Sequence, residues 1–308
     1  MTFTAKDVAA LRDRTGAGMM DCKKALTHTD GDMDKAAEYL REQGISVAAK
    51  KASRIASEGA VVAYTSADGK VGALVELNCE SDFVARSDAF TEIADIIVKQ
   101  AAEINPADND ALLNSKVGKD TVNDLITATT AKTGEKISFR RFVRQEGVKE
   151  EAYIHMGGKI GVLLEVDTDK NVNDNAEFNT MCHDIAMHIA AFAPQYIYNE
   201  EVPAEQTEHE KEILRIQAAN DPKNANKPKE VLEKMIVGRL GKFYKEVCLI
   251  DQEFAKDASI TIRQLVENTG KNIGAKITLK KFTRFVMGEG LEKRNDNFAE
   301  EIAKMQNM

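Results

Sequence analysis

The feature of this 308-residue chain that most constrains its fold is an internal repeat. Tyr64 recurs as Tyr153 and Glu76 recurs as Glu165, each pair 89 positions apart. The same offset relates Gly69-Lys70-Val71-Gly72 to Gly158-Lys159-Ile160-Gly161, Asp95-Ile96 to Asp184-Ile185, and Ala101-Ala102 to Ala190-Ala191. A run of matches without a gap indicates a duplicated structural unit. The chain is therefore expected to contain two copies of one core.

The end of this unit recurs at a larger offset. Phe139, Phe142 and Gly147 match Phe282, Phe285 and Gly290, 143 positions later. The second copy thus holds 143 − 89 = 54 additional residues, which must lie between Ala191 and Phe282. Helical patterns over 205–219 and 229–247, broken by a segment with two prolines, predict an inserted antiparallel helical hairpin.

Within one copy the sequence predicts strands and helices together. The apolar run 71–77 reads as a strand, and Asp68-Gly69 before it is a strong hairpin signal. Helices are expected over 90–103 and around 119–131, and a closing strand over 137–145. The fold class is therefore α+β, with a duplicated core of antiparallel sheets and packed helices.

The N-terminal residues read as three short helices with a small core. Met19, Cys22 and Leu26 have helical spacing and are expected to face that core, whereas Met20 lies off the stripe and should be more exposed. Gly44 is expected to end the third helix, and residues 46–59 to form a connector.

The predicted organisation has five parts. They are a helical domain (1–55), the first core copy (56–148), the second core copy (149–200 and 245–290), the inserted hairpin (201–244) and a C-terminal helical module (291–308). In the last part, Phe298, Ile302 and Met305 form the apolar side of a helix. That helix could dock on a partner or cap the chain's own core.

Composition narrows the class of protein. The net charge is −8, so a direct nucleic-acid contact is not expected. No apolar run approaches 18 residues, and the N-terminus lacks the features of a signal peptide, so we expect a cytoplasmic protein without membrane contact. The four cysteines are scattered and indicate neither a zinc site nor a disulfide framework.

No catalytic constellation is evident. Met156-Gly157-Gly158-Lys159-Ile160 lacks the first glycine and the hydroxyl residue of a phosphate-binding loop. His183 and His188, five apart on an expected helix, point about 140° apart and do not form a metal pair. We therefore expect a protein that is not an enzyme and needs no cofactor or metal. A hidden acid–base site among the many carboxylates is the weaker alternative.

The loop after the first apolar strand differs between the copies. Asn78-Cys79-Glu80-Ser81-Asp82-Phe83-Val84-Ala85-Arg86 places an aromatic residue between two charges, whereas Asp169-Lys170-Asn171-Val172-Asn173 in the second copy has no aromatic residue. Phe83 could anchor the loop in the core, or it could be a wedge offered to a partner. Because the second copy does without an aromatic residue here, we favour the wedge.

Two long motifs resemble bacterial elongation factor Ts. One is the segment 78–85, with Ser81 where that family usually has threonine; the other is Leu11-Arg12-Asp13-Arg14-Thr15-Gly16-Ala17-Gly18-Met19-Met20-Asp21-Cys22-Lys23-Lys24-Ala25-Leu26. The resemblance covers essentially the whole chain. It implies a ubiquitin-associated-like N-terminal domain, a coiled-coil insertion, and guanine-nucleotide exchange on elongation factor Tu in protein synthesis.

The resemblance also implies roles for particular residues. Ser81, Asp82, Phe83 and Val84 would form a loop that disturbs the Mg²⁺ region of elongation factor Tu so that GDP leaves, after which GTP displaces the factor. Arg12, Met19, Met20 and His155 would contact the same partner. The chain itself would bind no nucleotide. A homodimer through the helical hairpin, and a non-catalytic adaptor that uses the ubiquitin-associated-like domain, are the alternatives.

Overall fold

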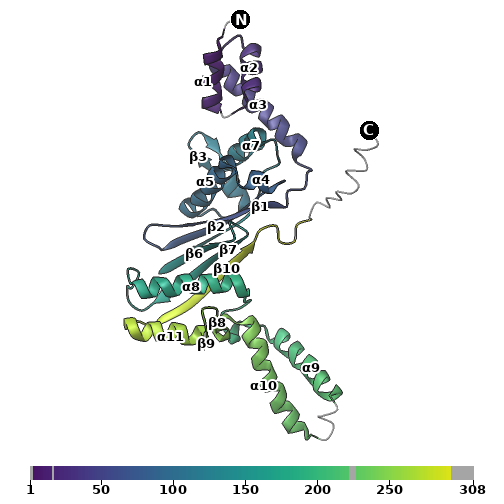
Figure 1. The fold of residues 1–308 in the computed structure, drawn as a ribbon, viewed down its shortest axis with the longest axis vertical. Coiled ribbons are helices and arrows are strands. Elements are labelled where there is room, and N and C mark those ends of the chain that lie inside the picture. Colours follow the sequence, from purple (N-terminus) through teal and green to yellow (C-terminus); the bar gives the residue numbers. More distant parts are fainter. Residues whose placement is uncertain (1–2, 16, 222–226, 293–308) are drawn as a thin grey trace.

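The computed structural model describes residues 3–15, 17–221 and 227–292 (Figure 1). It is an elongated α+β structure, as predicted, that runs from an N-terminal helical bundle through two stacked sheets to a projecting helical arm. The expected C-terminal helix, with Phe298, Ile302 and Met305, lies outside the described residues.

None of the described helices combines the length and the apolar composition needed to cross a membrane.

The first sheet is antiparallel with the strand order β1-β2-β5. Its strands are β1 (Glu58–Thr65), β2 (Val71–Cys79) and β5 (Ser138–Glu146). The predicted turn joins β1 to β2: Asp68 Oδ1 accepts the Lys70 N–H (3.1 Å), and Gly69 takes the positive φ (69°) that the turn requires. β2 is buried on both faces, which explains its continuous apolar run.

Helices cover the outer face of this sheet (Figure 1). They are α5 (Asp88–Ile104) and α7 (Val122–Thr133), with α4 (Asp82–Ala85), α6 (Asn109–Leu113), β3 (Lys116–Val117) and β4 (Asp120–Thr121) in the connections. The α7 helix begins at a capping box of Thr121 and Asp124 and ends at Gly134 with φ 73°. Val75 and Ile97 belong to the core between sheet and helices.

The second copy repeats this plan. Its sheet has the order β10-β7-β6, with β6 (Lys149–His155), β7 (Ile160–Thr168) and β10 (Ile277–Val286), and its other elements are α8 (Ala176–Phe192), β8 (Glu253–Phe254), β9 (Asp257–Thr261) and α11 (Ile262–Ile273). The α11 helix begins at a capping box of Thr261 and Gln264 and ends at Gly274, each 140 positions after its counterpart in α7.

The closing strands β5 and β10 also correspond at 140: Arg141 lies opposite Glu76, Lys281 lies opposite Glu165, and both sheets shift register directly after these pairs. The predicted match of Phe139 and Phe142 with Phe282 and Phe285 at 143 is therefore wrong, and the second copy holds a net 140 − 89 = 51 additional residues.

The alignment of the two copies changes by one residue after the strands. The buried residues of α5 match those of α8 at an offset of 88, as for Phe90 with Phe178 and Ile97 with Ile185. The predicted match of Asp95-Ile96 with Asp184-Ile185 is therefore wrong: Ile96 is exposed and Ile185 is buried. Because the strands match at 89, the connection before the helix is one residue shorter in the second copy.

The two sheets face each other across a small apolar layer. Val61 and Leu74 of the first sheet meet Leu163 and Phe285 of the second. The strands approach closely at Gly72, where an added Cβ would lie 2.4 Å from a Leu163 methyl group. The core is thus a stack of helices, sheet, sheet and helices (Figure 1).

The N-terminal bundle consists of α1 (Ala5–Thr15), α2 (Met19–His28) and α3 (Met33–Lys51). Leu11, Cys22 and Leu26 are fully buried in it, but Met19 is 43% exposed, so its predicted place in the core stripe is wrong. The prediction that Gly44 ends the third helix is also wrong, because α3 continues to Lys51. An added Cβ at Gly44 would lie 3.4 Å from the Cβ of Ala131, so this glycine lets α3 lie close against α7.

The helical arm is formed by α9 (Ala204–Asn220) and α10 (Lys229–Val247), close to the predicted helices. The short 3₁₀ turns η1 (Asn199–Glu201) and η3 (Leu249–Asp251) lie at its base. Leu214, Ile236 and Leu240 form its apolar seam, and Arg215 pairs with Glu233 across the two helices (3.4 Å). The arm projects away from both sheets (Figure 1).

Candidate functional site

Phe83 lies on α4 and is the most exposed large apolar residue in the part of the chain that the structure describes, at 84%. The interpretation of Phe83 as a core anchor is therefore wrong. The predicted polar loop is also shorter than expected, because Asn78 and Cys79 complete β2 and are buried. What remains is a single helical turn that presents one aromatic side chain to solvent.

Ser81 holds this turn at its start. Its hydroxyl accepts the N–H of Val84 (3.3 Å), so Ser81 is the N-cap of α4. The same hydroxyl donates to Glu135 Oε1 (2.7 Å), and the Ser81 N–H donates to Glu135 Oε2 (2.9 Å). Glu135 directly follows the C-cap of α7. The turn is therefore tied to a helix end that is 54 residues away in sequence.

Glu80 and Cys79, which precede the turn in the sequence, also hold it in place. Glu80 Oε1 accepts the N–H of Lys136 (2.7 Å), and Glu80 also pairs with Arg54 (3.2 Å). The Cys79 thiol donates to the carbonyl oxygen of Ser81 (3.0 Å). Burial, together with the nearby Glu135 carboxylate, raises the pKa of Cys79 to about 12, so the thiol stays protonated and serves as a donor. Glu80 and Glu135 were not predicted, since their role depends on a contact between distant segments.

The neighbours of Phe83 are held on the protein surface. Val84 is half-buried and packs against the core of the first copy. Asp82 pairs with Arg86 one turn later (3.2 Å), and both side chains are largely exposed. Phe83 is thus the one fully exposed residue of α4.

The other predicted contact residues lie at two separate places. Arg12, Met19 (43% exposed) and Met20 (64% exposed) are on the N-terminal bundle, and Met20 is the more exposed, as predicted. His155 is the last residue of β6, and its Nδ1 lies 2.9 Å from the Tyr153 hydroxyl. The structure does not bring these residues together with Phe83 (Figure 1).

Met156 is the strongest exposed feature that the sequence reasoning missed. It is 70% exposed and has a φ of 50°, in the turn between β6 and β7. Its signal in the sequence was a methionine directly before two glycines in a predicted hairpin turn. Met156 and Gly157 are thus the exposed residues at the end of this hairpin.

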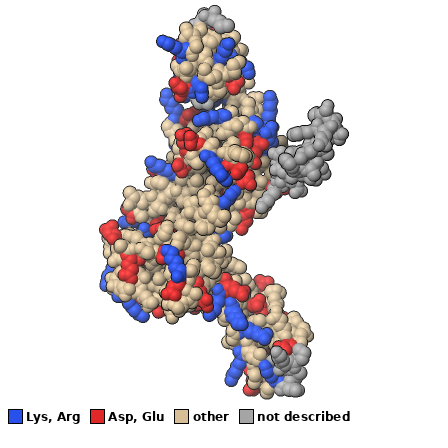
Figure 2. Space-filling model, viewed as in Figure 1, with Lys and Arg blue, Asp and Glu red and all other residues tan. Residues whose placement is uncertain are grey.

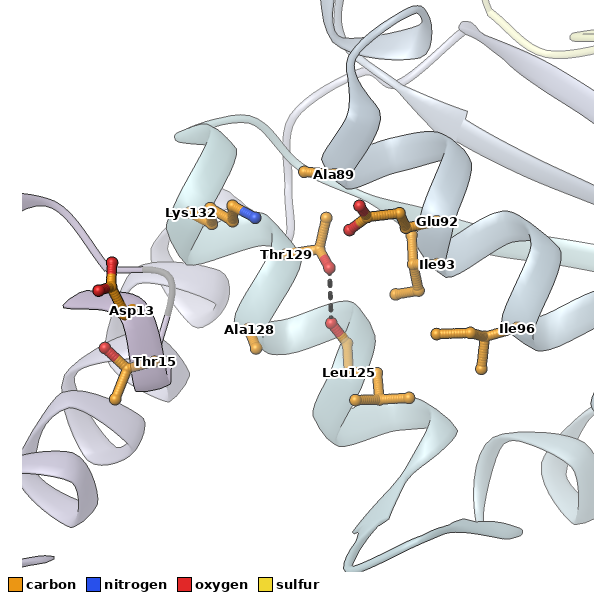
Figure 3. Close-up of a pocket in the computed structure, with 10 residues that line it drawn as sticks. All are labelled: Asp13, Thr15, Ala89, Glu92, Ile93, Ile96, Leu125, Ala128, Thr129 and Lys132. Carbon is orange, nitrogen blue, oxygen red and sulfur yellow. Dashed lines mark hydrogen bonds between the residues drawn. The ribbon is translucent and has the colours of Figure 1, made fainter. Parts of the chain in front are cut away.

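A hollow of about 320 Å³ separates the N-terminal bundle from the first copy (Figure 3). It is lined by Asp13 and Thr15 of α1, by Ala89, Glu92, Ile93 and Ile96 of α5, and by Leu125, Ala128, Thr129 and Lys132 of α7. The floor is apolar and the charged groups stand at the rim (Figure 3). None of the ten lining residues is a histidine or a cysteine.

The histidines that were considered as ligands have other partners. His188 is fully buried between α8 and η3, where Nε2 lies 2.9 Å from Gln252 Oε1, and burial lowers its pKa. His183 lies 3.2 Å from Glu151 at the surface. Within the described ranges, no group of three or more His, Cys, Asp or Glu side chains could hold a metal ion.

Charges of both signs intermingle on the face of the molecule shown in Figure 2. Arg41 pairs with Asp124 (3.0 Å) and so ties α3 to the start of α7. Lys159 pairs with Glu58 (2.8 Å) and ties the second hairpin to β1. These two ion pairs thus join neighbouring parts of the molecule.

Comparison with known proteins gives a consistent result over the full length. A family model described as Elongation factor TS matches residues 80–289. A protein of Symbiobacterium thermophilum named Elongation factor Ts is 46% identical over 306 residues, covering 98% of this chain and 97% of that protein. Proteins of the same name from Clostridium perfringens (98% of this chain, 99% of that protein) and Clostridium novyi (99% of each) are 47% identical over 306 and 310 residues.

Proposed function

The chain belongs to the elongation factor Ts family, a family of translation elongation factors, and from this premise we propose that it releases GDP from elongation factor Tu. The observation that carries the proposal is Phe83, an 84% exposed aromatic residue on a helical turn braced by Glu80 and Glu135. A side chain that is exposed in the free protein and rigidly presented gains its contacts only in a complex. It is therefore suited to drive a change in the partner.

Exchange by such a factor is a coupling between two ligands of one GTPase. The factor must bind the nucleotide-free GTPase more tightly than the loaded one, and nucleotide must weaken the factor to the same extent. In our proposal Phe83 enters the region of elongation factor Tu that orders the Mg²⁺ ion, with Asp82 beside its polar groups and Val84 behind. Binding of GTP then displaces the factor.

The binding free energy that Phe83 alone could contribute can be estimated. Burial of a phenylalanine side chain contributes about 1.5–3 kcal/mol, which corresponds to about one to two powers of ten in affinity. The remaining energy must come from a broader contact. We assign it to the N-terminal bundle, through Arg12, Met19 and Met20, and to the second hairpin, through His155.

Along the long axis of the molecule, α4 lies between the N-terminal bundle and the second sheet (Figure 1). The bundle is fixed to the first copy by Arg41 and by the close contact at Gly44. The second hairpin is fixed to β1 by a bond from the Val61 N–H to the Gly158 carbonyl (2.8 Å). Such connections allow binding at the ends to press Phe83 against the partner. In this proposal the N-terminal bundle is the ubiquitin-associated-like domain.

The test is the rate of release of fluorescent GDP from elongation factor Tu. We expect the wild-type chain to accelerate release and Phe83→Ala to lose about 10- to 100-fold of that acceleration. Binding to nucleotide-free elongation factor Tu, measured in parallel, should weaken but persist because the two anchors remain.

The matched control is Phe192→Ala. Phe192 is the other exposed phenylalanine of the described chain, half-exposed at the end of α8 in the second copy. We expect this variant to release GDP at the wild-type rate. No acceleration by the wild-type chain would refute the exchange function and favour an adaptor. Equal loss in both variants would show that Phe83 has no special role.

A further inference from the structure

The two sheets meet at two junctions that are equivalent by the repeat. At one, the Val61 N–H donates to the carbonyl oxygen of Gly158 (2.8 Å); at the other, the Glu150 N–H donates to the carbonyl oxygen of Gly69 (2.7 Å). Both the donors and the acceptors are 89 positions apart. In each junction the edge strand of one copy (β1 or β6) bonds to the hairpin turn of the other copy. The backbone is the same, but the side chains are valine and glutamate.

Both side chains fill the same buried space. An added Cβ at Gly161 would lie 2.4 Å from a Val61 methyl carbon, and an added Cβ at the equivalent Gly72 would lie 3.1 Å from the Glu150 Cβ. Val61 and Glu150 are both completely buried. At this buried place one junction therefore has a side chain that carries a carboxyl group, and the other has an apolar side chain.

The Glu150 carboxyl group lacks a hydrogen-bonding partner in the described protein. Both of its oxygens are buried and accept no hydrogen bond. Glu165 lies directly opposite Glu150 in the register of β6 and β7, and Lys281 lies opposite Glu165 on β10. Side chains directly opposite on one face have Cβ atoms about 4.5–5.5 Å apart, and like charges there repel. This row contains two acids and one base.

The equivalent row of the first sheet is balanced. Val61 lies opposite Glu76, and Glu76 lies opposite Arg141. Glu76 accepts hydrogen bonds from Arg141 Nε (2.7 Å), Arg140 (2.8 Å) and the Gly288 N–H (2.8 Å). The second row thus differs by one uncompensated carboxyl group, and that group is Glu150.

The other elements around Glu150 do not supply a partner. Arg144 of β5 and Lys281 of β10 act on it from a distance and favour its charged form, and Gly72 of β2 lies against its Cβ. On the opposite face of β6, Glu151 is engaged with His183 of α8. Burial, followed by the charge of Glu165, raises the pKa of Glu150 to about 8.

We propose that Glu150 is a proton-dependent latch between the two sheets, which seals its junction when protonated, as Val61 does, and loosens it when ionised. A protonated carboxyl group is a hydrogen-bond donor. An acceptor without a partner is present in the same junction, since Gln145 lies opposite Gly72 and its side-chain oxygen is buried and unbonded. Ionisation instead places a charge in a space shaped for an apolar group.

The direction of the pH dependence follows from this. The folded protein holds the Glu150 proton more tightly than the unfolded chain, so between about pH 4.5 and pH 8 the unfolded chain binds fewer protons. The stability that this proton contributes is complete below the unfolded pKa. It is lost as the pH rises toward 8 and changes no further above it.

The direct test is a ¹³C NMR titration of the full chain labelled at glutamate side-chain carboxyl carbons. Glu150→Gln assigns the Glu150 signal by its disappearance. We expect this signal to titrate near pH 8, while the other glutamates titrate near their ordinary values. Titration of Glu150 with the others, between pH 4 and 5, would overturn the proposal.

The second test is urea unfolding at pH 6 and pH 9. For wild type we expect the unfolding constant to rise by up to about tenfold per pH unit below pH 8. In Glu150→Gln and Glu150→Val this part of the rise should be absent. Glu267→Gln, which changes an exposed carboxylate on α11, should keep the wild-type pH dependence. The same pH dependence in all four proteins would also overturn the proposal.

Discussion

The loops after β2 and β7 begin at equivalent strand ends and lead to equivalent helices, yet only one presents an aromatic side chain. Glu80 and its counterpart Asp169 make equivalent hydrogen bonds. Glu80 accepts the N–H of Lys136, just before β5 (2.7 Å), and Asp169 accepts the N–H of Lys276, just before β10 (2.7 Å). The two loops differ in the residues that follow these acids and precede the helices α5 and α8.

The one-residue difference in length decides what each loop presents. At the helix offset of 88, Val84 corresponds to Val172, and both pack against the core of their own copy. Phe83 then corresponds to Asn171. The first loop forms the helical turn α4, whereas the second has no helix before α8. Both copies thus keep the acid and the valine in equivalent roles, and only the first copy adds an aromatic residue between them.

The largest effect is expected where the two charge rows differ. Glu76→Ala should lower the free energy of unfolding by about 3 kcal/mol, because it removes the buried carboxylate that pairs with both Arg140 and Arg141. The counterpart Glu165→Ala should change it by less than about 1 kcal/mol, since Glu165 forms none of these bonds. Urea unfolding at pH 7 measures both; equal losses would contradict the asymmetry.

The Glu76 carboxylate also makes the stability of the protein depend on pH in the acid range. Burial opposes ionisation of Glu76, but the bonds from Gly288, Arg140 and Arg141 hold its pKa below the ordinary value. The stability that Glu76 contributes is therefore present above the unfolded pKa and is lost as the pH falls through the lower folded value.

The second effect concerns exchange of the loops themselves. Replacement of residues 81–86 by residues 170–174 should leave the first copy folded, because both loops connect equivalent elements. We expect this chimera to lose about 10- to 100-fold of the acceleration of GDP release, the contribution of one buried phenylalanine. Circular dichroism checks the fold. Wild-type release by a folded chimera would show that the loop is not the wedge.

The smallest effect is expected from two N-cap variants, which distinguish the support of Phe83 from the overall stability of the protein. Ser81→Ala removes the cap of α4 and the hydroxyl bond to Glu135, while the backbone bond from Ser81 to Glu135 remains. Asn175→Ala removes the cap of α8, in which the Asn175 Oδ1 accepts the Phe178 N–H (3.0 Å). Each should cost about 1 kcal/mol of stability. Only Ser81→Ala should slow GDP release, by a few-fold. Similar slowing in both variants would mean that stability alone is responsible.

Much of the fold could be predicted because its signals are local or periodic. The Asp68-Gly69 turn, the apolar run of β2 and the helical spacing of Phe90, Ile93 and Ile97 act through neighbours in the chain. The predictions were wrong where a segment distant in the sequence determines the local structure. Glycine is common at helix ends and so predicts an end at Gly44, but α3 continues through Gly44, which lies against Ala131 of α7.

For the candidate site, the sequence identified Phe83 but not its support. The absence of an aromatic residue at the corresponding place of the second copy favoured exposure, and the structure confirms the exposure. Glu80 and Glu135 could not be assigned, because the Ser81–Glu135 contact joins residues 54 positions apart. The contact roles of Arg12, Met20 and His155 remain predictions.

The sequence by itself determined the duplication, the α+β class and the place of the insertion, because repeats and hydrophobic periods are properties of the chain order. Only the tertiary structure decided which side chains the fold leaves exposed and which it buries without a partner. Phe83 and Glu150 show why: burial depends on what the other copy places against a residue, and no local pattern contains that information.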